Sequence, residues 1–381
     1  MTGNFRGRAV SIVSFLIVAT TLAGFTQPRV SYAIDPNIPR VPTGVEGSSI
    51  SQEIELGAAY LAGSGVARDE KRAAYWYEKA ANSGDPAAQN EIGYLYQAGI
   101  GVERDPVRAV RWYERAVAGG LISAKVNLGV AYIWGLGVRK DPVFGAELFR
   151  EAAQKGSGMG ACYLGDMYYF GVGVTKSESE ARRWFELASK LHNIPAKADL
   201  AMLLLSHPDQ TSQKRAMRLL REASAAGSVA AKHQLGLKLI QRPELSHSSD
   251  EATKVLDEAA SDGSWKSSAV LGILSREGKG VAKDPKEAYY HFRVAALQGR
   301  EEAATLVAND IRLLSSELGK EQVQQVDQQA NAWVQKHNRS LEFVNLHNDF
   351  AKGFPAIALG HPQPDDHAAL LVAAPEANET P

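Results

Sequence analysis

The sequence predicts an all-α fold, an α/α solenoid in which helix pairs stack into a right-handed superhelix. Three observations support this prediction: a motif that recurs every 36 residues, helical periodicity on both sides of it, and capping residues where helices should begin and end. Seven repeat units cover residues 51–300. Because each unit can bury its apolar face only against its neighbours, we expect stability to grow with the number of units.

The recurring motif is the loop Gly-x-Gly-Val. A Leu-Gly or Ile-Gly pair precedes it, with weaker copies of that pair in the fifth to seventh units. A phosphate-binding loop normally occurs once and follows a strand, whereas this loop recurs between helical segments. We therefore interpret it as a turn between two helices and exclude nucleotide binding. The five copies begin at Gly63, Gly99, Gly135, Gly171 and Gly278.

Each unit is predicted to contain a first helix before the loop and a second helix after it. The first helix ends at the loop, since glycine adopts a positive φ at a helix C-terminus at little steric cost. The second helix begins at an acidic or hydroxyl N-cap, followed in three units by proline at the first helical position. The predicted N-caps are Asp69, Asp105, Asp141, Ser177, Ser212, Ser248 and Asp284.

Glycines are also predicted to end the second helices, at Gly84, Gly120, Gly156, Gly227, Gly263 and Gly299. In the fourth unit His192 and Asn193 stand there instead, and asparagine tolerates the left-handed conformation. The aromatic pairs of the second helices recur with the repeat and are therefore predicted to fill the core of each unit. They are Trp76-Tyr77, Trp112-Tyr113 and Trp184-Phe185.

The segments outside the repeats differ from them in composition. Residues 1–33 contain Arg6 and Arg8, an apolar run and no acidic residue, which is typical of a signal peptide cleaved after Ala33. Residues 34–50 are predicted to be an extended leader, 301–340 two capping helices, and 341–381 a mostly disordered tail. We expect an exported, periplasmic protein, or alternatively a secreted one, that meets the membrane only through its signal peptide before cleavage.

The consensus A-x3-LG-x2-Y-x2-G-x-GV-x2-D-x3-A-x2-WY-x2-A resembles the Sel1-like repeat of exported bacterial proteins, a relative of the tetratricopeptide repeat. This resemblance implies an adaptor or regulator rather than an enzyme. It implies an envelope protein as partner: a membrane sensor kinase that controls exopolysaccharide output, or alternatively a component of a polysaccharide secretion complex. It is also compatible with a secreted effector, or with a protein that binds or hydrolyses cell-wall fragments, as some cysteine-rich members do, although this chain has only Cys162.

Composition and motifs limit the possible functions further. Lys plus Arg number 42 against 43 Asp plus Glu, so the chain lacks the basic excess of a nucleic-acid-binding protein. No catalytic, cofactor-binding or metal-ligating set is predicted; the segment from His361 to His367 could supply metal ligands, but it lies in the expected tail. Cys162 is either a packed thiol or a redox sensor. The oligomeric state is left open.

Partner binding is predicted on a groove formed by the first helices. With Leu56 and Gly57 as the buried register, positions one and four residues after the glycine should face this groove. The residue before the loop is alanine in the first two units and a large aromatic in the third and fourth, which suggests a partner contact or local packing against the next loop. The predicted partner-binding residues are Tyr94, Gln97, Ile133, Trp134, Asp166, Tyr169 and Phe170.

Overall fold

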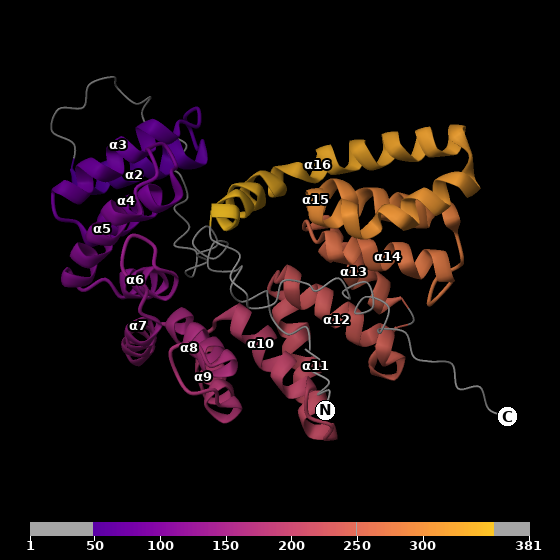
Figure 1. Ribbon diagram of the computed structural model, residues 1–381, viewed down its shortest axis with the longest axis horizontal. Helices are drawn as coiled ribbons and strands as arrows, with labels where there is room; N and C mark the ends of the chain where they lie inside the picture. The colour runs from indigo at the N-terminus through magenta and orange to yellow at the C-terminus, as the bar shows by residue number, and fades with distance from the viewer. Residues whose placement is uncertain (1–48, 249, 354–381) are drawn as a thin grey trace, which may run out of the picture. The chain divides into compact units, whose positions relative to one another are not determined.

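The structure is a computed structural model that describes residues 49–248 and 250–353, and these residues form helices and turns without a strand (Figure 1). The all-α prediction is therefore confirmed for the described residues. The predicted signal peptide, most of the leader, and the part of the predicted tail after Gly353 lie outside them. Among the described residues, no helix combines the length and hydrophobicity needed to cross a bilayer.

Seven consecutive helix pairs occupy the repeat region that the structure describes. In each pair the two helices pack against each other, as the α/α prediction requires. The hand and course of the stack stay predictions. The pairs are α2 (Ile50–Ala62) with α3 (Glu70–Asn82), α4 (Pro86–Ala98) with α5 (Pro106–Ala118), α6 (Ile122–Trp134) with α7 (Pro142–Gln154), α8 (Gly158–Phe170) with α9 (Glu178–Lys190), α10 (Ile194–Leu205) with α11 (Gln210–Ala225), α12 (Val229–Gln241) with α13 (Glu251–Ser261), and α14 (Trp265–Glu277) with α15 (Pro285–Leu318).

The described residues fall into two compact parts, 49–193 and 194–353. The first part contains the four pairs from α2 to α9. The second contains the three pairs from α10 to α15, a short 3-10 helix, η1 (Pro243–Leu245), and α16 (Lys320–Gly353), which packs against α15. Each part is described by itself below.

The loop glycines adopt the predicted left-handed conformation, and the second glycine of a loop has a further role. Gly135 caps α6 with φ 71°, and Gly137 follows with φ 72°. A Cβ atom on Gly137 would overlap the carbonyl oxygen of Pro106 in the first turn of α5. The loop of the third pair therefore packs directly on the second helix of the preceding pair, so this glycine joins neighbouring pairs as well as ending a turn.

Five of the predicted N-caps are confirmed, and two are wrong. Asp209, not Ser212, caps α11: its Oδ1 atom accepts the backbone N–H of Ser212 at 2.8 Å, so the helix begins one turn earlier than predicted. Asp250, not Ser248, precedes α13. Both errors fall in units that lack Gly-x-Gly-Val, where the spacing from loop to cap no longer follows the other units.

Two predicted helix ends also differ. In the fourth pair His192, rather than Asn193, adopts the positive φ, at 58°. Gly299 does not end a helix, because α15 continues through it to Leu318. A Cβ on Gly299 would lie 2.6 Å from Cγ of Trp265, so this glycine allows close packing on α14. The predicted end of the repeats at residue 300 thus lies inside α15, and α16 extends past residue 340.

In six of the seven described pairs, all except α10 with α11, the core is built around the glycine of the Leu-Gly or Ile-Gly motif. A Cβ on Gly129 of α6 would lie 2.7 Å from the Phe149 ring of α7, so the missing side chain makes room for that ring. Phe149 is fully buried, as is its counterpart Tyr113. The aromatic-core prediction holds for Tyr77, Trp112, Tyr113 and Phe185, which are buried, whereas Trp76 and Trp184 are half-buried.

A partly buried polar contact joins two first helices in the second compact part. Nδ1 of His233 on α12 lies 2.9 Å from Oγ of Ser267 on α14, and Ser267 is fully buried. Desolvation, together with the nearby positive charge of Lys266, lowers the pKa of His233 to about 4. His233 is therefore neutral in the folded protein at neutral pH.

We expect this histidine to make folding pH-dependent. An unfolded histidine binds a proton near pH 6.5, whereas folded His233 does so only near pH 4. Stability should therefore fall as the pH drops from about 6.5 to about 4, by up to about 3 kcal/mol from this group, with no further loss below pH 4. In urea unfolding, the His233→Gln variant should not show this loss of unfolding free energy between pH 6.5 and pH 4. The control variant His247→Gln, which changes an exposed histidine, should show it as wild type does. Equal pH profiles for wild type and His233→Gln would contradict the prediction.

Candidate protein-binding face

Four of the predicted partner-binding residues lie half-buried on the first helices of three successive pairs. Tyr94 is on α4, Trp134 ends α6, and Tyr169 and Phe170 end α8. We call the surface that carries these four residues the first-helix face. Trp134 and Phe170 occupy equivalent positions 36 residues apart, where the first two pairs carry Ala62 and Ala98.

Three predicted residues are buried, so the expected exposure was wrong for Gln97, Ile133 and Asp166. Ile133 follows Gly129 by four residues, and positions four apart lie on the same side of a helix. Because Gly129 faces the second helix, Ile133 faces it too: its Cγ1 atom lies 2.6 Å from where a Cβ on Gly145 of α7 would be. Gln97 has the same relation to Gly93. Asp166 directly follows a glycine of this kind and is also buried.

The aromatic end of α8 is ordered by ring packing. The rings of Tyr169 and Phe170 meet edge to face, with centroids 5.0 Å apart and an interplanar angle of 90°. Nζ of Lys176, in the loop that follows, lies 6.0 Å from the centroid of the Tyr169 ring. This end of the first-helix face therefore presents aromatic surface held in a fixed geometry, which favours contact with a partner.

A polar cluster that the sequence reasoning missed lies on α4 and α6. Nδ2 of Asn127 donates to Oδ1 of Asn90 at 2.8 Å, and Nδ2 of Asn90 donates to Oε1 of Glu91 at 3.3 Å. Burial raises the pKa of Glu91, and the hydrogen bond from Asn90 partly offsets that rise. One sequence signal could have revealed the cluster: the residue before the Leu-Gly or Ile-Gly pair is polar in three successive units, at Glu55, Glu91 and Asn127.

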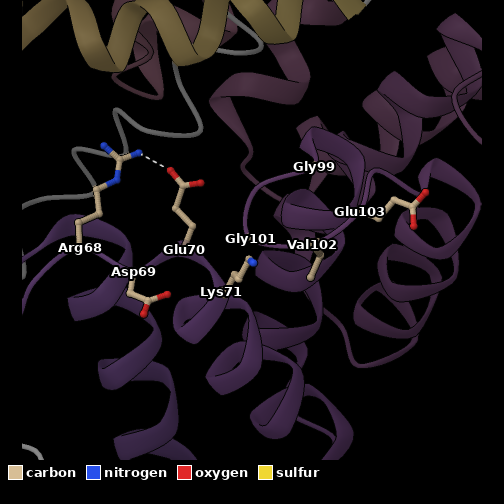
Figure 2. Close-up of a pocket in the computed structure, with 8 residues that line it drawn as sticks. All are labelled: Arg68, Asp69, Glu70, Lys71, Gly99, Gly101, Val102 and Glu103. Carbon is tan, nitrogen blue, oxygen red and sulfur yellow. Dashed lines mark hydrogen bonds and ion pairs between the residues drawn. The ribbon is translucent and has the colours of Figure 1, made fainter.

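A depression lies between the loop of the second pair and the first turn of α3 (Figure 2). Nη2 of Arg68 and Oε1 of Glu70 form an ion pair at 2.7 Å, and Figure 2 shows these side chains meeting at one side of the depression. The N-terminus of α3 is already capped, since Oδ1 of Asp69 accepts the N–H of Arg72 at 3.0 Å. With Glu103, the lining carries three acids against the two bases Arg68 and Lys71. The lining residues are Arg68, Asp69, Glu70, Lys71, Gly99, Gly101, Val102 and Glu103.

The remaining site predictions concern the thiol and metal ligands. Cys162 is buried in α8, and its redox role stays a prediction. Within the described residues, no group of three or more His, Cys, Asp or Glu side chains could hold a metal ion. The segment from His361 to His367 lies outside the described residues.

Comparison with known families places these helix pairs in context. The family model described as Sel1 repeat matches six segments, which together make up more than half of the chain. It leaves residues 229–265 unmatched, although α12 and α13 form a helix pair there. No match was found among curated proteins. The six segments are residues 53–85, 86–121, 122–157, 158–193, 196–228 and 266–299.

Two solved structures illustrate what the chain is similar to. A Sel1 repeat protein from Oxalobacter formigenes is 27% identical over 65% of this chain and 99% of its own, with a TM-score of 0.57. A protective antigen from uropathogenic Escherichia coli strains, with an SLR fold, is 24% identical over 83% of this chain and 74% of its own, with a TM-score of 0.49. The first of these supports an array of helix pairs of the same kind.

Proposed function

This chain belongs to the Sel1 repeat family, and from that premise we propose that it is a non-catalytic adaptor that binds another protein of the bacterial envelope along the first-helix face. A Sel1 repeat array is suited to protein–protein interaction and is typically an interaction scaffold rather than an enzyme. Stacked helix pairs offer an extended surface whose residues can vary without disturbing the core. The proposal assigns binding to this surface.

One observation carries the proposal: large aromatics replace alanine at one position of the first-helix face. Trp134 and Phe170 are half-buried at the C-terminal ends of α6 and α8, where the core does not require a ring, since Ala62 and Ala98 serve in the first two pairs. Aromatic side chains bury a large apolar area at low conformational cost and dominate binding energies at interfaces. A partner contact explains their presence here.

The envelope location and the kind of partner are parts of the same proposal. Arg6, Arg8 and the apolar run before Ala33 support export. The resemblance to exported family members supports a membrane sensor kinase that controls exopolysaccharide output as the partner. A tagged chain would be used to capture partners from cross-linked envelope fractions. Recovery of a membrane kinase would support the proposed regulator. Recovery of a polysaccharide export component would instead assign the chain to a secretion complex as a scaffold. Recovery of no protein partner would contradict the adaptor function.

We expect Trp134→Ala to reduce partner capture strongly while costing little stability. The side chain is half-buried at a helix end, so its removal should cost about 1 kcal/mol or less in unfolding free energy, whereas interface aromatics typically contribute about 2 kcal/mol or more to binding. Capture and thermal unfolding would be measured on the same preparation. A proportional loss of both would place Trp134 in the core rather than at an interface.

A further inference from the structure

The polar cluster around Glu91 has a feature that the later pairs lack. In the first two pairs the aromatic ring that packs on the glycine of the Leu-Gly or Ile-Gly motif belongs to a tyrosine. Tyr77 packs on Gly57 and Tyr113 on Gly93, and a Cβ atom added to either glycine would lie within 3.0 Å of that ring. In the third and fourth pairs the same position holds phenylalanine. An aromatic ring without a hydroxyl is therefore enough to fill the core at this position. The hydroxyl groups of Tyr77 and Tyr113 are not needed for that packing.

The hydroxyl of Tyr113 is buried and lacks a hydrogen-bond partner among the residues that the structure describes. Buried hydroxyl groups are normally hydrogen-bonded, so an orphan of this kind calls for an explanation. Burial raises the pKa of Tyr113, and the nearby Glu91 and Tyr94 raise it further. The hydroxyl is thus near Glu91 and Tyr94, two half-buried residues of α4 that stand about one helical turn apart.

Glu91 is an acidic side chain with no cation beside it among the described residues. Within the described part of the chain it forms no ion pair, and its one hydrogen bond is with the Asn90 amide. Burial and the Glu91 charge together raise the pKa of Tyr94 to about 12, and they raise that of Tyr77 as well. The described groups that interact with Glu91 are Asn90, which donates to it, and Tyr77, Tyr94 and Tyr113, whose pKa values it raises; none of them supplies a positive charge.

The chemistry of this site selects the charge of its ligand. A partly desolvated carboxylate is stabilised by a positive group that also donates hydrogen bonds, and surrounding tyrosines accept such donors through their oxygens and ring faces. A cation would favour the ionised form of Glu91 against the effect of burial, whereas an anion would oppose it and a neutral donor would leave an ionised Glu91 uncompensated. The first-helix face at α4 is therefore complementary to an ammonium or guanidinium group.

We propose that Glu91, with Tyr94 beside it on the half-buried surface of α4, receives a lysine or arginine side chain from a segment of the partner protein. This inference rests on the proposed adaptor function, and it specifies the chemistry of the partner at one position. Trp134 and Phe170 would contact apolar residues of the same partner, while Glu91 would hold its cation. The site consists of the half-buried Glu91 and Tyr94; Asn90 donates to Glu91, and Asn127, Tyr77 and Tyr113 are buried nearby.

The test is a selection of random dodecapeptides displayed on phage against the full chain. Wild type would be compared with Glu91→Gln and with a matched control, Glu55→Gln, which changes the exposed acid at the equivalent position one repeat earlier. We expect wild type and Glu55→Gln to enrich peptides that share a lysine or arginine, and Glu91→Gln to lose this preference. Because glutamine keeps the shape of glutamate, both variants should unfold at the wild-type temperature.

Synthetic copies of the strongest peptide then give a double-mutant cycle. Glu91→Gln should weaken its binding roughly tenfold or more, as should replacing the peptide cation with norleucine, and the two changes together should cost little more than either alone. Enriched peptides with no shared cation, or equal binding to both variants, would overturn the inference but leave the adaptor in place. Absence of any enriched peptide counts against the adaptor itself. Glu91-dependent binding of a peptide of residues 34–48 would assign the site to the chain's own leader and overturn the assignment to a partner.

Discussion

Replacing Gly137 with alanine is expected to destabilise the chain by about 3 kcal/mol or more. Two effects add. A left-handed backbone with φ 72° costs a non-glycine residue about 1 kcal/mol. The new methyl group would also overlap the carbonyl oxygen of Pro106, which belongs to the backbone of α5 and cannot rotate away. The loop must therefore separate from the preceding pair, and the contact between two neighbouring pairs is lost.

The chain provides a matched control for this prediction. Gly280 has nearly the same φ, 70°, but no atom lies within 4 Å of where its Cβ would be. Gly280→Ala should therefore cost only the conformational part, about 1 kcal/mol. Thermal and urea unfolding of both variants would be compared with wild type. Equal losses of unfolding free energy in the two variants would show that the second loop glycine is needed only for the turn and that its contact with the preceding pair adds no stability.

Phe149→Ala is expected to cost about 3–5 kcal/mol, the usual range for removing a buried phenylalanine. Its ring lies over Gly129 in the third pair and meets the ring of Tyr163 at a centroid distance of 5.1 Å. The cavity left behind would join three helices, α6, α7 and α8. Because each pair is stabilised by its neighbours, we expect the loss to lower the cooperativity of unfolding as well as its midpoint.

The control for Phe149 lies on the same helix. Phe144, in the first turn of α7, is 38% exposed, and its ring contacts that of Tyr132 at a centroid distance of 4.7 Å. Phe144→Ala should cost about 1 kcal/mol. A loss of similar size from both variants in urea unfolding would contradict the assignment of the Phe149 ring as the centre of the pair.

The repeat period predicted the helix pairs because both helices of a pair are encoded locally, by a glycine loop, a cap and an apolar stripe. It even located the pair α12 and α13, which the family model leaves unmatched. The single-residue errors have a different origin. Gly299 lies inside α15, where its missing side chain leaves room for Trp265, 34 residues earlier, and the sequence alone does not indicate which partner a glycine makes room for.

The candidate site was predictable only in part, for a geometric reason. Trp134 and Phe170 stood out because they break the repeat. Ile133 was assigned to the wrong side of its helix, since a residue four positions after a buried glycine shares that buried side. The Glu91 cluster was missed although the polar residues before three Leu-Gly or Ile-Gly pairs mark its place. The tyrosines near it come from the second helices, and only the packed structure brings them close to Glu91.

Photo-crosslinking in cells would test whether a partner protein binds the first-helix face. Benzoylphenylalanine would be placed at position 134 on α6 in one version and at position 75 on α3 in another, since Tyr75 is 59% exposed on a second helix. We expect a discrete adduct with one envelope protein from position 134, weakened by Glu91→Gln, and none from position 75. Adducts from position 75 alone, or none from either position, would contradict binding at this face.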